Sequence, residues 1–592
     1  MRNRNRIMLA AAPFALAGVM LAGCAATSAT GAATSGAQTA SDVVSVEASL
    51  TAEQVIADND DATTVTVDEV ASTTSTTITL TGDSATVEGE GVSVDGSTVT
   101  ITAGGSYTVT GSLDGALVVA APEDAVVAIT LDDATIKNSE GSALAITGAD
   151  DVVLVLAEGS TNTLSDGGSY AEDAEVNAAL YSAADLTISG DGALIVEGNG
   201  NDAITSKDDL KILGGDISVT AADDGLRGKD SLTIEGGTVT VEAGGDGLTS
   251  DQDEDETQGY VWISGGTVDI TSDGDGISAV TDVVITGGEI TVTAGGGSSA
   301  TVSEDVSAKG IKSGMYLVIE GGTVTADAAD DAVHSDGAVH INSGTLTAGS
   351  GDDGVHAEAA LFIDGGEVTI STSYEGLESA QIEIGGGVVY IRASDDGMNA
   401  SSGTGAMQAD GSTITITGGE ITLDADGDGF DSNGSATMTG GTLTIWGPTG
   451  DGNGAIDVNG TFDVSGGTLL AAGSAGMAVA PSADSAQGWV FASVSGSEGD
   501  TVQIVSNGTV LAEYTAQKDF ATVVYSGEGI TSGSSYDVVV DGTATTVTAG
   551  EGGAGGMGGG QPGGQGGQGG GQPGGGGGFG QDGQGSSSGG RS

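Results

Sequence analysis

The sequence has one cysteine, 6 prolines and 13 basic residues in a chain of 592, and only 3% of its residues are aromatic. A single cysteine cannot form an intrachain disulfide, so other interactions must stabilise the fold. The 13 Lys and Arg residues stand against 84 Asp and Glu residues, which gives a formal net charge of −71. This charge repels nucleic acid and anionic lipid. It favours cations, or a saccharide held through cations, as partners of the folded part.

The first residues have the features of an export signal. Arg2, Arg4 and Arg6 precede an apolar run from Ile7 to Leu21 that is too short for a membrane-spanning helix. Cys24 then stands at the position that bacterial lipoproteins use for lipidation, although a plain secretory signal with an incidental cysteine is an alternative. We predict a lipoprotein signal peptide at residues 1–23, lipidation at Cys24 and anchoring at the cell surface, on the extracellular face of the membrane.

Two segments have compositions that do not support a packed core. Residues 24–55 are rich in Ala, Ser, Thr and Gly without periodicity, and we predict a flexible linker there. Residues 550–592 are dominated by Gly and cannot bury apolar surface, so we predict a disordered tail.

The sequence between these segments is repetitive. Gly-Gly pairs begin at positions 214, 236, 265, 287, 321, 365, 386, 418, 440 and 466, and several successive spacings are 21 or 22 residues. Each copy alternates apolar and polar residues, as in Thr238-Val239-Thr240-Val241, without a helical pattern. Leucine-rich repeats and calcium-binding nonapeptide repeats do not fit this signature or period. We therefore predict an all-β fold, a right-handed parallel β-helix (a solenoid of about 22 residues per coil), over residues 56–480.

Two columns of aliphatic residues are predicted to point inward, because stacked columns let a coil bury a core without helices. The first column is Ile204, Leu226, Leu248, Ile277, Ile311, Val333, Val355, Leu377, Met398 and Phe430. The second is Ile217, Val239, Val268, Ile290, Val324, Leu346, Val368, Val389, Ile421 and Leu443.

Acidic residues recur at one position of successive coils, mostly before glycine. Equivalent residues of adjacent coils lie about 4.8 Å apart, where two carboxylates repel by roughly 3 kcal/mol at an effective dielectric constant near 20. Ca²⁺ binds oxygen ligands and would relieve this repulsion, whereas Asp-Gly is also simply good turn chemistry. The predicted calcium ligands are Asp202, Asp223, Asp224, Asp246, Asp275, Asp330, Asp331, Asp352, Asp353, Asp395, Asp396 and Asp428.

A second acidic segment, DQDEDE at residues 251–256, interrupts the repeat. Its alternating aspartates resemble a calcium loop, so Asp251, Asp253 and Asp255 are further candidate ligands. The glycine and the distant glutamate of an EF-hand are missing, and a solvated acidic loop is the alternative.

Cationic residues are predicted to point outward beside the acidic column. They could hold the carboxylates of uronate sugars, or they could simply neutralise the neighbouring aspartates. These candidate carbohydrate-binding residues are Arg227, Lys229, Lys312, His334 and His356.

A second outward column contains two aromatic residues, Trp262 and Phe362. Aromatics are scarce in this chain, so we predict that the pair is exposed and forms a platform for sugar rings. Packing under an insertion is the alternative.

Several stretches together resemble one family. They are ITLTGDSATVEGEGVSVDGSTVTITAGGSYTVTGSLDGALVV from residue 78, LAEGSTNTLSD, NDAITSKDDLKILGGDISVTAADDGLRGKDSLTIEGG and SDQDEDETQGYVWISGG. They resemble the bacterial carbohydrate-binding β-helix family that is related in fold to pectate-lyase-type polysaccharide lyases. The resemblance covers roughly residues 56–545. It implies binding of cellulose or of acid sugars such as polygalacturonate, bound calcium at the Asp-Asp-Gly corners, and no demonstrated lyase activity. Residues 481–549 look like the end of that family, and we predict a small C-terminal β cap that closes the open coil edge.

The sequence thus predicts a monomeric, non-enzymatic carbohydrate-binding lipoprotein with Ca²⁺ as cofactor and extracellular polysaccharide as partner. One alternative is a calcium-dependent lyase with Lys207, Lys229 or Arg227 as base. A surface lysine among carboxylates is expected to have a raised pKa, which would make it a poor base. A structural surface protein or adhesin, which needs only the stiff coil and its tether, is the other alternative.

Overall fold

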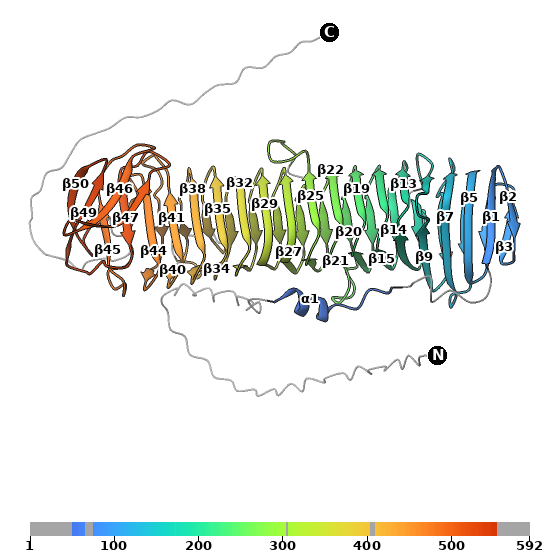
Figure 1. Ribbon diagram of the computed structural model, residues 1–592, viewed down its shortest axis with the longest axis horizontal. Helices are drawn as coiled ribbons and strands as arrows, with labels where there is room; N and C mark the ends of the chain where they lie inside the picture. The colour runs from blue at the N-terminus through green and yellow to red at the C-terminus, as the bar shows by residue number, and fades with distance from the viewer. Residues whose placement is uncertain (1–49, 65–74, 172, 304–305, 403–408, 553–592) are drawn as a thin grey trace, which may run out of the picture. The chain divides into compact units, whose positions relative to one another are not determined.

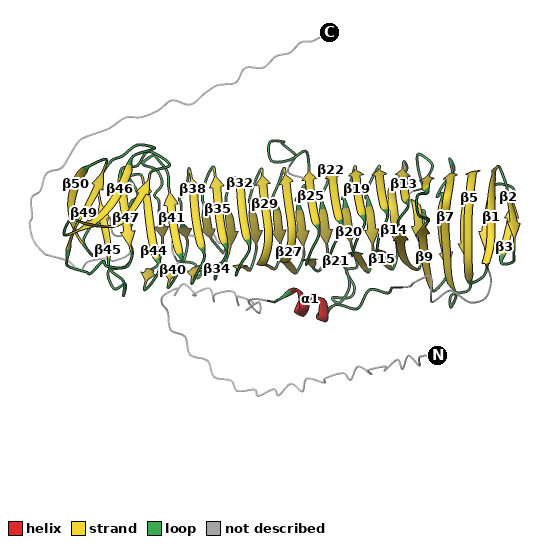
Figure 2. Ribbon diagram, in the orientation of Figure 1, coloured by secondary structure: helices red, strands yellow, loops and turns green. Residues whose placement is uncertain are grey.

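Strands dominate the computed structural model, which describes residues 50–64, 75–171, 173–303, 306–402 and 409–552 (Figure 2). All of these residues belong to one unit, Val46–Ser592. The predicted signal peptide, Cys24, most of the predicted linker and nearly all of the predicted Gly-rich tail lie outside them. Within the described ranges, α1 (Ala52–Asp58) is the only helix, and none is long and apolar enough to span a bilayer.

Short strands form a sheet of 16 members in which successive neighbours come from successive repeats (Figure 1). Its strands are β3 (Val92–Asp95), β4 (Thr98–Ile101), β6 (Ala116–Ala120), β8 (Leu144–Gly148), β11 (Ala178–Ser182), β14 (Asp202–Ser206), β17 (Leu226–Gly228), β20 (Leu248–Ser250), β23 (Ile277–Ala279), β26 (Ile311–Ser313), β28 (Val333–Ser335), β30 (Val355–Ala357), β33 (Leu377–Ser379), β36 (Met398–Ala400), β39 (Asp431–Ser432) and β42 (Asp457–Val458).

A second sheet has 30 strands, and the long strands β27 and β29 each pair with two strands of the repeat before or after them. Its strands are β1 (Ser75–Gly82), β2 (Ala85–Glu88), β5 (Gly105–Asp114), β7 (Val126–Lys137), β9 (Asp151–Leu156), β10 (Thr161–Ser165), β12 (Asp185–Gly190), β13 (Ala193–Gly198), β15 (Asp209–Ile212), β16 (Asp216–Ala221), β18 (Ser231–Ile234), β19 (Thr238–Ala243), β21 (Tyr260–Ile263), β22 (Thr267–Ser272), β24 (Val283–Ile285), β25 (Glu289–Ala294), β27 (Tyr316–Ala328), β29 (Ala338–Ser350), β31 (Ala360–Ile363), β32 (Glu367–Thr372), β34 (Gln381–Ile384), β35 (Val388–Ala393), β37 (Thr413–Ile416), β38 (Glu420–Ala425), β40 (Ser435–Met438), β41 (Thr442–Trp446), β43 (Phe462–Val464), β44 (Thr468–Gly473), β45 (Trp489–Ala492) and β48 (Thr522–Ser526).

The pairing between neighbouring repeats is parallel along most of the chain. Leu226 of β17 pairs with Leu248 of β20, and Val239 of β19 pairs with Val268 of β22. Two residues that pair in this way occupy the same position in consecutive repeats. The long sheets of parallel strands make the fold all-β and are consistent with the predicted β-helix.

Antiparallel pairing is confined to the two ends of this stack. At the N-terminal end, β1 pairs with β2 and β3 pairs with β4. At the C-terminal end, β48 pairs with both β44 and β45. A separate antiparallel sheet follows, made of β46 (Thr501–Ser506), β47 (Thr509–Thr515), β49 (Ser535–Val540) and β50 (Thr543–Thr548). Its Val502 and Val538 share a small core with Leu470 of β44.

Both predicted inward columns form the core. Every residue of the two columns is at most 1% exposed, and all belong to one hydrophobic cluster that runs from Ile78 to Val524. Full burial of such an aliphatic side chain stabilises a fold by roughly 1.5–3 kcal/mol. The repeated columns therefore contribute much of the stability of a fold that has a single short helix among its described residues.

Each repeat contains two kinds of glycine, and a different steric constraint requires glycine at each. Gly237, the second residue of a Gly-Gly pair, has φ +88°, a conformation that strongly favours glycine. Gly225, in the Asp-Gly pair, has no positive φ, but a Cβ atom there would collide with the inward side chain of Val241. The glycine of the Asp-Gly pair is thus required by core packing as well as by the turn.

Residues 50–64 differ from their prediction. They form what we call the N-terminal strap, which includes α1 and lies across the outer face of the 30-stranded sheet. Thr51 caps α1 through a capping box with Gln54, and Val55 packs with Val284 and Val318. Residues 50–55 are therefore not part of a flexible linker, and residues 56–64 are not a first coil, because an apolar face and a helix cap hold them on the sheet.

Candidate metal and carbohydrate site

In the acidic column, backbone amides of one repeat donate hydrogen bonds to side-chain carboxylates of the repeat before it. The N–H of Asp246 donates to Oδ1 of Asp224 at 2.9 Å, and the N–H of Asp275 donates to Oδ1 of Asp246 at 2.8 Å. The N–H of Asp353 donates to Oδ1 of Asp331 at 3.0 Å. One oxygen of each such carboxylate thus satisfies the amide of the next repeat. This role was not predicted, and it explains an acidic column without any metal.

The other carboxylate oxygen faces the cationic column in much of the stack. Oδ2 of Asp275 lies 3.5 Å from Nζ of Lys312, and Oδ2 of Asp202 lies 3.8 Å from Nη1 of Arg227. The same arrangement brings His334 to Asp331 at 2.7 Å and His356 to Asp353 at 3.2 Å. The geometry matches the alternative that these cations neutralise the aspartates.

Lys309 takes the place of an aspartate in the column. Its Nζ lies 2.7 Å from Oδ2 of Asp330 and 2.9 Å from Oδ2 of Asp331. Asp330, Asp331 and Asp352 do approach one another, with one oxygen of each within 4.8 Å of the others. A lysine ammonium therefore already bonds two of these three predicted calcium ligands.

In the N-terminal part of the column, nearby cations do not fully neutralise the carboxylates. Burial and repulsion from Asp202 and Asp246 raise the pKa of Asp224 to about 7, and burial together with Asp275 raises the pKa of Asp246 to about 6. By contrast, hydrogen bonds from His334 and Lys309 overcome the effect of burial and lower the pKa of Asp331 to about 2. The strain from like charge is therefore uneven along the column.

The section from Glu375 to Asp457 has the least compensation. Among the described residues, no Lys, Arg or His forms an ion pair with Glu375, Asp396, Asp428 or Asp431. Burial and Asp428 raise the pKa of Asp396 to about 8, and burial and Asp457 raise the pKa of Asp431 to about 7. These four carboxylates, Glu375, Asp396, Asp428 and Asp431, are what we call the uncompensated section. Two of them, Asp396 and Asp428, are predicted ligands, and the other two were not assigned to metal from the sequence.

Asn399 adds a buried oxygen to the uncompensated section. Its Nδ2 donates to Oε2 of Glu375 at 2.8 Å, while its Oδ1 is buried without a hydrogen-bond partner within the described part of the chain. Asn399 pairs with Asp431 on the neighbouring strand. Carboxylates and an unsatisfied amide oxygen form a donor set made only of oxygen, which is the kind that Ca²⁺ prefers.

An exposed aromatic ring lies beside this section. Tyr374 is 48% exposed, and hydrogen bonding to Asp395 raises its pKa to about 12. It directly precedes Glu375, one of the uncompensated carboxylates. Tyr374 was not among the predicted site residues. The sequence does contain a signal for it, because in this repeat an aromatic residue precedes the residue of the acidic column.

The remaining predicted ligands of the column are less enclosed. Asp223 and Asp352 are exposed, and Asp395 is half-buried. Asp223 and Asp224 are consecutive, so only Asp224 occupies the hydrogen-bonded position of the column.

In the acidic segment at residues 251–256, two of the three predicted ligands have protein partners. Asp251 accepts two hydrogen bonds from the guanidinium of Arg227, and Asp255 accepts from the N–H and the hydroxyl of Thr257. Asp253 and Asp255 are exposed. These contacts of Asp251 and Asp255 favour the alternative, a solvated acidic loop.

The same contact changes the interpretation of Arg227. Its planar guanidinium already makes a two-fold interaction with Asp251, so it is not free to hold a uronate carboxylate in this way. Lys229 and Lys207 lie nearby. Burial and the charge of Arg227 lower the pKa of Lys207, which is opposite to the sequence-based expectation of a raised value.

The predicted aromatic platform is covered. Trp262 pairs with Thr233 and Val284 in the expected column, but it is half-buried and packs with Val55 and Val284 under the strap. Phe362 is 4% exposed and packs with Ala338 and Ala360. The expectation of an exposed pair is therefore wrong for Phe362, which packs among residues of its own sheet. The strap covers Trp262.

The structure contains a further acidic pocket that the sequence did not reveal. Its volume is about 270 Å³, and Asp60, Asp61 and Thr63 of the strap line it together with Asp208, Asp209, Asp230, Gln258 and Tyr260. The 22-residue spacing of Asp208 and Asp230 was a visible signal. The sequence contained no sign that the strap contributes to this pocket, because the strap residues are about 150 positions away in the chain. One such contact is the 2.7 Å hydrogen bond from the N–H of Thr63 to Asp209.

The carbohydrate-binding domain-containing protein family matches residues 95–354 and 353–558 of this chain. The chain belongs to this family. The family is named for binding, and not for a reaction.

One curated protein and one solved structure are similar to this chain. A carbohydrate-binding domain-containing protein of Acetivibrio thermocellus is 35% identical over 126 residues, which are 20% of this chain and 44% of the relative. The chain thus spans less than half of that protein. A solved structure, described as a gadolinium derivative of the polysaccharide lyase-like protein from C. thermocellum, covers 46% of this chain and 98% of its own chain, with 30% identity and a TM-score of 0.36.

Proposed function

We propose that the protein binds acidic polysaccharide, such as polygalacturonate, through Ca²⁺ held on the uncompensated section. The observation that carries this proposal is a run of carboxylates that no cation of the described residues neutralises, with the unsatisfied Oδ1 of Asn399 among them. Asp396, Asp428 and Asp431 would hold the ion together with that oxygen. Bound Ca²⁺ would supply a positive centre shared by protein and uronate carboxylates.

Tyr374 supports a sugar next to this site. An exposed ring beside charged groups can stack on one face of a sugar, and it lies directly before Glu375. A cellulose platform has less support, because Trp446 and Trp489 are at most 5% exposed and Trp262 is half-buried under the strap. Cellulose is therefore the weaker candidate ligand.

The proposal includes the predicted setting of the protein. The chain would be a monomer anchored to the extracellular face of the membrane by lipid on Cys24, at the cell surface. Its binding domain would be a right-handed β-helix of about 22 residues per coil, as in the spacing between Asp224 and Asp246. The antiparallel C-terminal strands β45–β50 would form the cap, since they cover the last parallel strand, β44.

Calorimetric titration with oligogalacturonate tests this function. Protein stripped with EDTA should not bind, and added Ca²⁺ should restore binding. The double variant Asp396→Asn and Asp428→Asn should lose this calcium-dependent binding, while Asp463→Asn, an exposed carboxylate of β43, should keep it. Equal affinity in EDTA, or in the double variant, would contradict the proposal.

One observation favours a polysaccharide lyase as a second candidate. The lowered pKa of Lys207 makes it a better base than a solvated lysine, and Arg227 and Asp202 lie within its electrostatic reach. Incubation with polygalacturonate and Ca²⁺ would then increase the absorbance from unsaturated products, and Lys207→Gln would abolish the increase. Without such an increase in the wild type, the protein acts by binding alone.

A further inference from the structure

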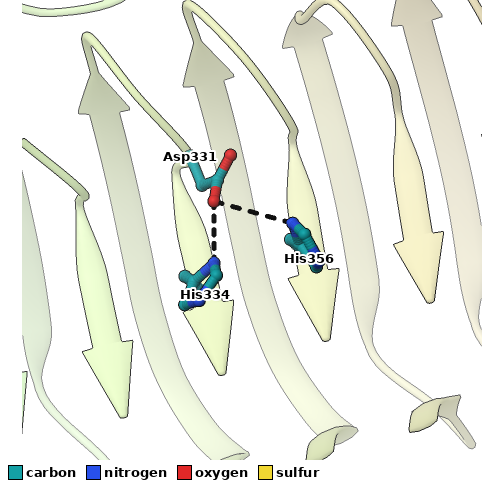
Figure 3. Close-up of side chains that lie close together, drawn as sticks. All are labelled: Asp331, His334 and His356. Atoms are coloured by element: carbon teal, nitrogen blue, oxygen red, sulfur yellow. Dashed lines mark hydrogen bonds and ion pairs between the residues drawn. The ribbon is translucent and has the colours of Figure 1, made fainter. Parts of the chain in front are cut away.

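Two of the three histidines of the chain lie side by side at equivalent positions of adjacent strands. His334 of β28 pairs with His356 of β30, and their rings are 4.9 Å apart at an interplanar angle of 65°. Asp331 contacts both rings, as the dashed lines in Figure 3 mark. His334 is 8% exposed and Asp331 is 2% exposed, so the cluster is largely removed from solvent.

The facing atoms of the cluster are all potential metal ligands. Oδ2 of Asp331 is 2.7 Å from Nδ1 of His334 and 3.8 Å from Nδ1 of His356. One ligand atom of each of the three residues lies within 4.8 Å of the others. Ligands of a tetrahedral Zn²⁺ site lie about 3.3 Å apart, given metal–ligand distances of about 2.0–2.1 Å. The two distances from Asp331 to the histidines each differ from this value by about half an ångström.

Further carboxylates complete the set. Nδ1 of His356 is 3.2 Å from Oδ2 of Asp353 and 3.7 Å from Oε2 of Glu378. These three residues also form a group whose ligand atoms lie within 4.8 Å of one another. Either carboxylate can provide a fourth ligand next to Asp331 and the two imidazoles.

The far nitrogens of both rings face carboxylates as well. Nε2 of His334 lies 3.0 Å from Oδ1 of Asp336, and Nε2 of His356 lies 4.0 Å from Oε1 of Glu358. A carboxylate hydrogen-bonded to the second ring nitrogen orients metal-binding histidines and fixes their tautomer, and Asp336 does this for His334. Nδ1 of each ring points toward Asp331, at the centre of the cluster.

We propose that Asp331, His334 and His356, with Asp353 or Glu378, bind a divalent transition-metal cation such as Zn²⁺. Imidazole nitrogen favours such ions, whereas Ca²⁺ prefers oxygen ligands alone. The ion would link strands β28 and β30, and it would be separate from the calcium site proposed on the uncompensated section. Lys309, whose Nζ lies 2.9 Å from Oδ2 of Asp331, would retain its contact with Asp330 when the ion binds.

Cobalt spectroscopy tests this site on the full chain without a histidine tag. In excess Ca²⁺, metal-free protein should bind one Co²⁺ with the visible spectrum of nitrogen and oxygen coordination, and Zn²⁺ should displace it. His334→Gln and His356→Gln should each lower the Zn²⁺ affinity at least tenfold. His340→Gln, the third histidine, should leave it unchanged, because His340 contacts Asp364 and Leu50 instead.

Lys309→Gln provides a test that does not remove a ligand. If Asp331 binds the ion, loss of the competing ammonium should tighten Zn²⁺ binding several-fold. Unchanged affinity in this variant, or Co²⁺ and Zn²⁺ binding that survives both cluster histidine substitutions, would overturn the proposal. If these variants fold poorly, imidazole ¹⁵N resonances of the wild-type chain give the answer. Zn²⁺ should shift those of His334 and His356 and not those of His340, and equal shifts in all three, or none, would exclude the site.

Discussion

Oδ1 of Asp224 accepts a hydrogen bond from the backbone N–H of Asp246 at a distance of 2.9 Å. The two residues occupy the same position in consecutive repeats, so a side chain of one repeat accepts the hydrogen bond of a backbone amide in the next. The acidic column is therefore part of the hydrogen bonding of the fold, and any bound cation acts on a column that already has a structural role.

Substitution of Asp224 separates this role from charge. Asp224→Asn keeps an oxygen that accepts the N–H of Asp246 and removes a charge, so we expect metal-free stability to be unchanged or higher. Asp224→Ala leaves a half-buried N–H without its acceptor and should cost about 1–3 kcal/mol. Urea unfolding in EDTA measures both variants, and equal stability of the two would show that the hydrogen bond does not matter.

The pKa values predict how the metal-free protein responds to pH. Carboxyls of the unfolded chain ionise near pH 4, whereas the pKa of Asp224 and Glu375 is about 7 and that of Asp396 is about 8. The folded state thus binds more protons between about pH 4 and pH 8, and the free energy of unfolding decreases as the pH rises through this range. In EDTA, the melting temperature should be higher at pH 5 than at pH 8. A melting temperature that increases over this range would contradict the charge assignment.

Bound calcium should oppose the loss of stability at high pH. A cation neutralises ionised carboxylates, so added Ca²⁺ should raise the melting temperature more at pH 8 than at pH 5. An unchanged melting temperature at pH 8 with and without EDTA would exclude calcium as a part of the scaffold.

Tyr374 provides a test of sugar stacking that is independent of the fold. Because the ring is 48% exposed, Tyr374→Ala should not change the melting temperature. It should weaken binding of oligogalacturonate about tenfold, equivalent to ~1.4 kcal/mol, while Tyr374→Phe retains the ring and most of the affinity. Equal affinity of the Ala variant would place the sugar elsewhere.

The docking of the strap can be followed through Trp262. Val55 is 1% exposed and packs in the same cluster as Trp262, so Val55→Asp should release the strap from the sheet. The fluorescence of Trp262 should then shift to longer wavelength, and cleavage by proteases within residues 50–64 should accelerate. Val388→Asp, at a position 50% exposed, is the matched control and should change neither.

The sequence revealed those features that repeat. The two inward columns were predicted residue by residue because period-two alternation and a recurrent spacing determine which side chains share a face, and all of them are buried. The acidic column and its cationic neighbours were predicted as positions, but their bonding was not. Which oxygen takes the N–H of the next repeat depends on side-chain rotamers, which spacing does not reveal.

The errors concern contacts that do not repeat. Trp262 points away from the coil as expected, yet the sequence contains no signal that residues 50–64 pack over it. The pairing of Arg227 with Asp251 similarly depends on the path of one insertion. Tyr374 and Asn399 were missed because each occurs in a single repeat, where a periodic pattern has no second copy for comparison.

The strap has a consequence for how the protein unfolds. In a stack of repeats each unit touches only its neighbours, so distant units can melt independently and the ends can fray. The strap instead contacts Asp209 through Thr63, Asp282 through Asn59 and His340 through Leu50. One short segment thereby couples units separated by more than 100 residues, and it should make the middle of the array melt as a single cooperative block.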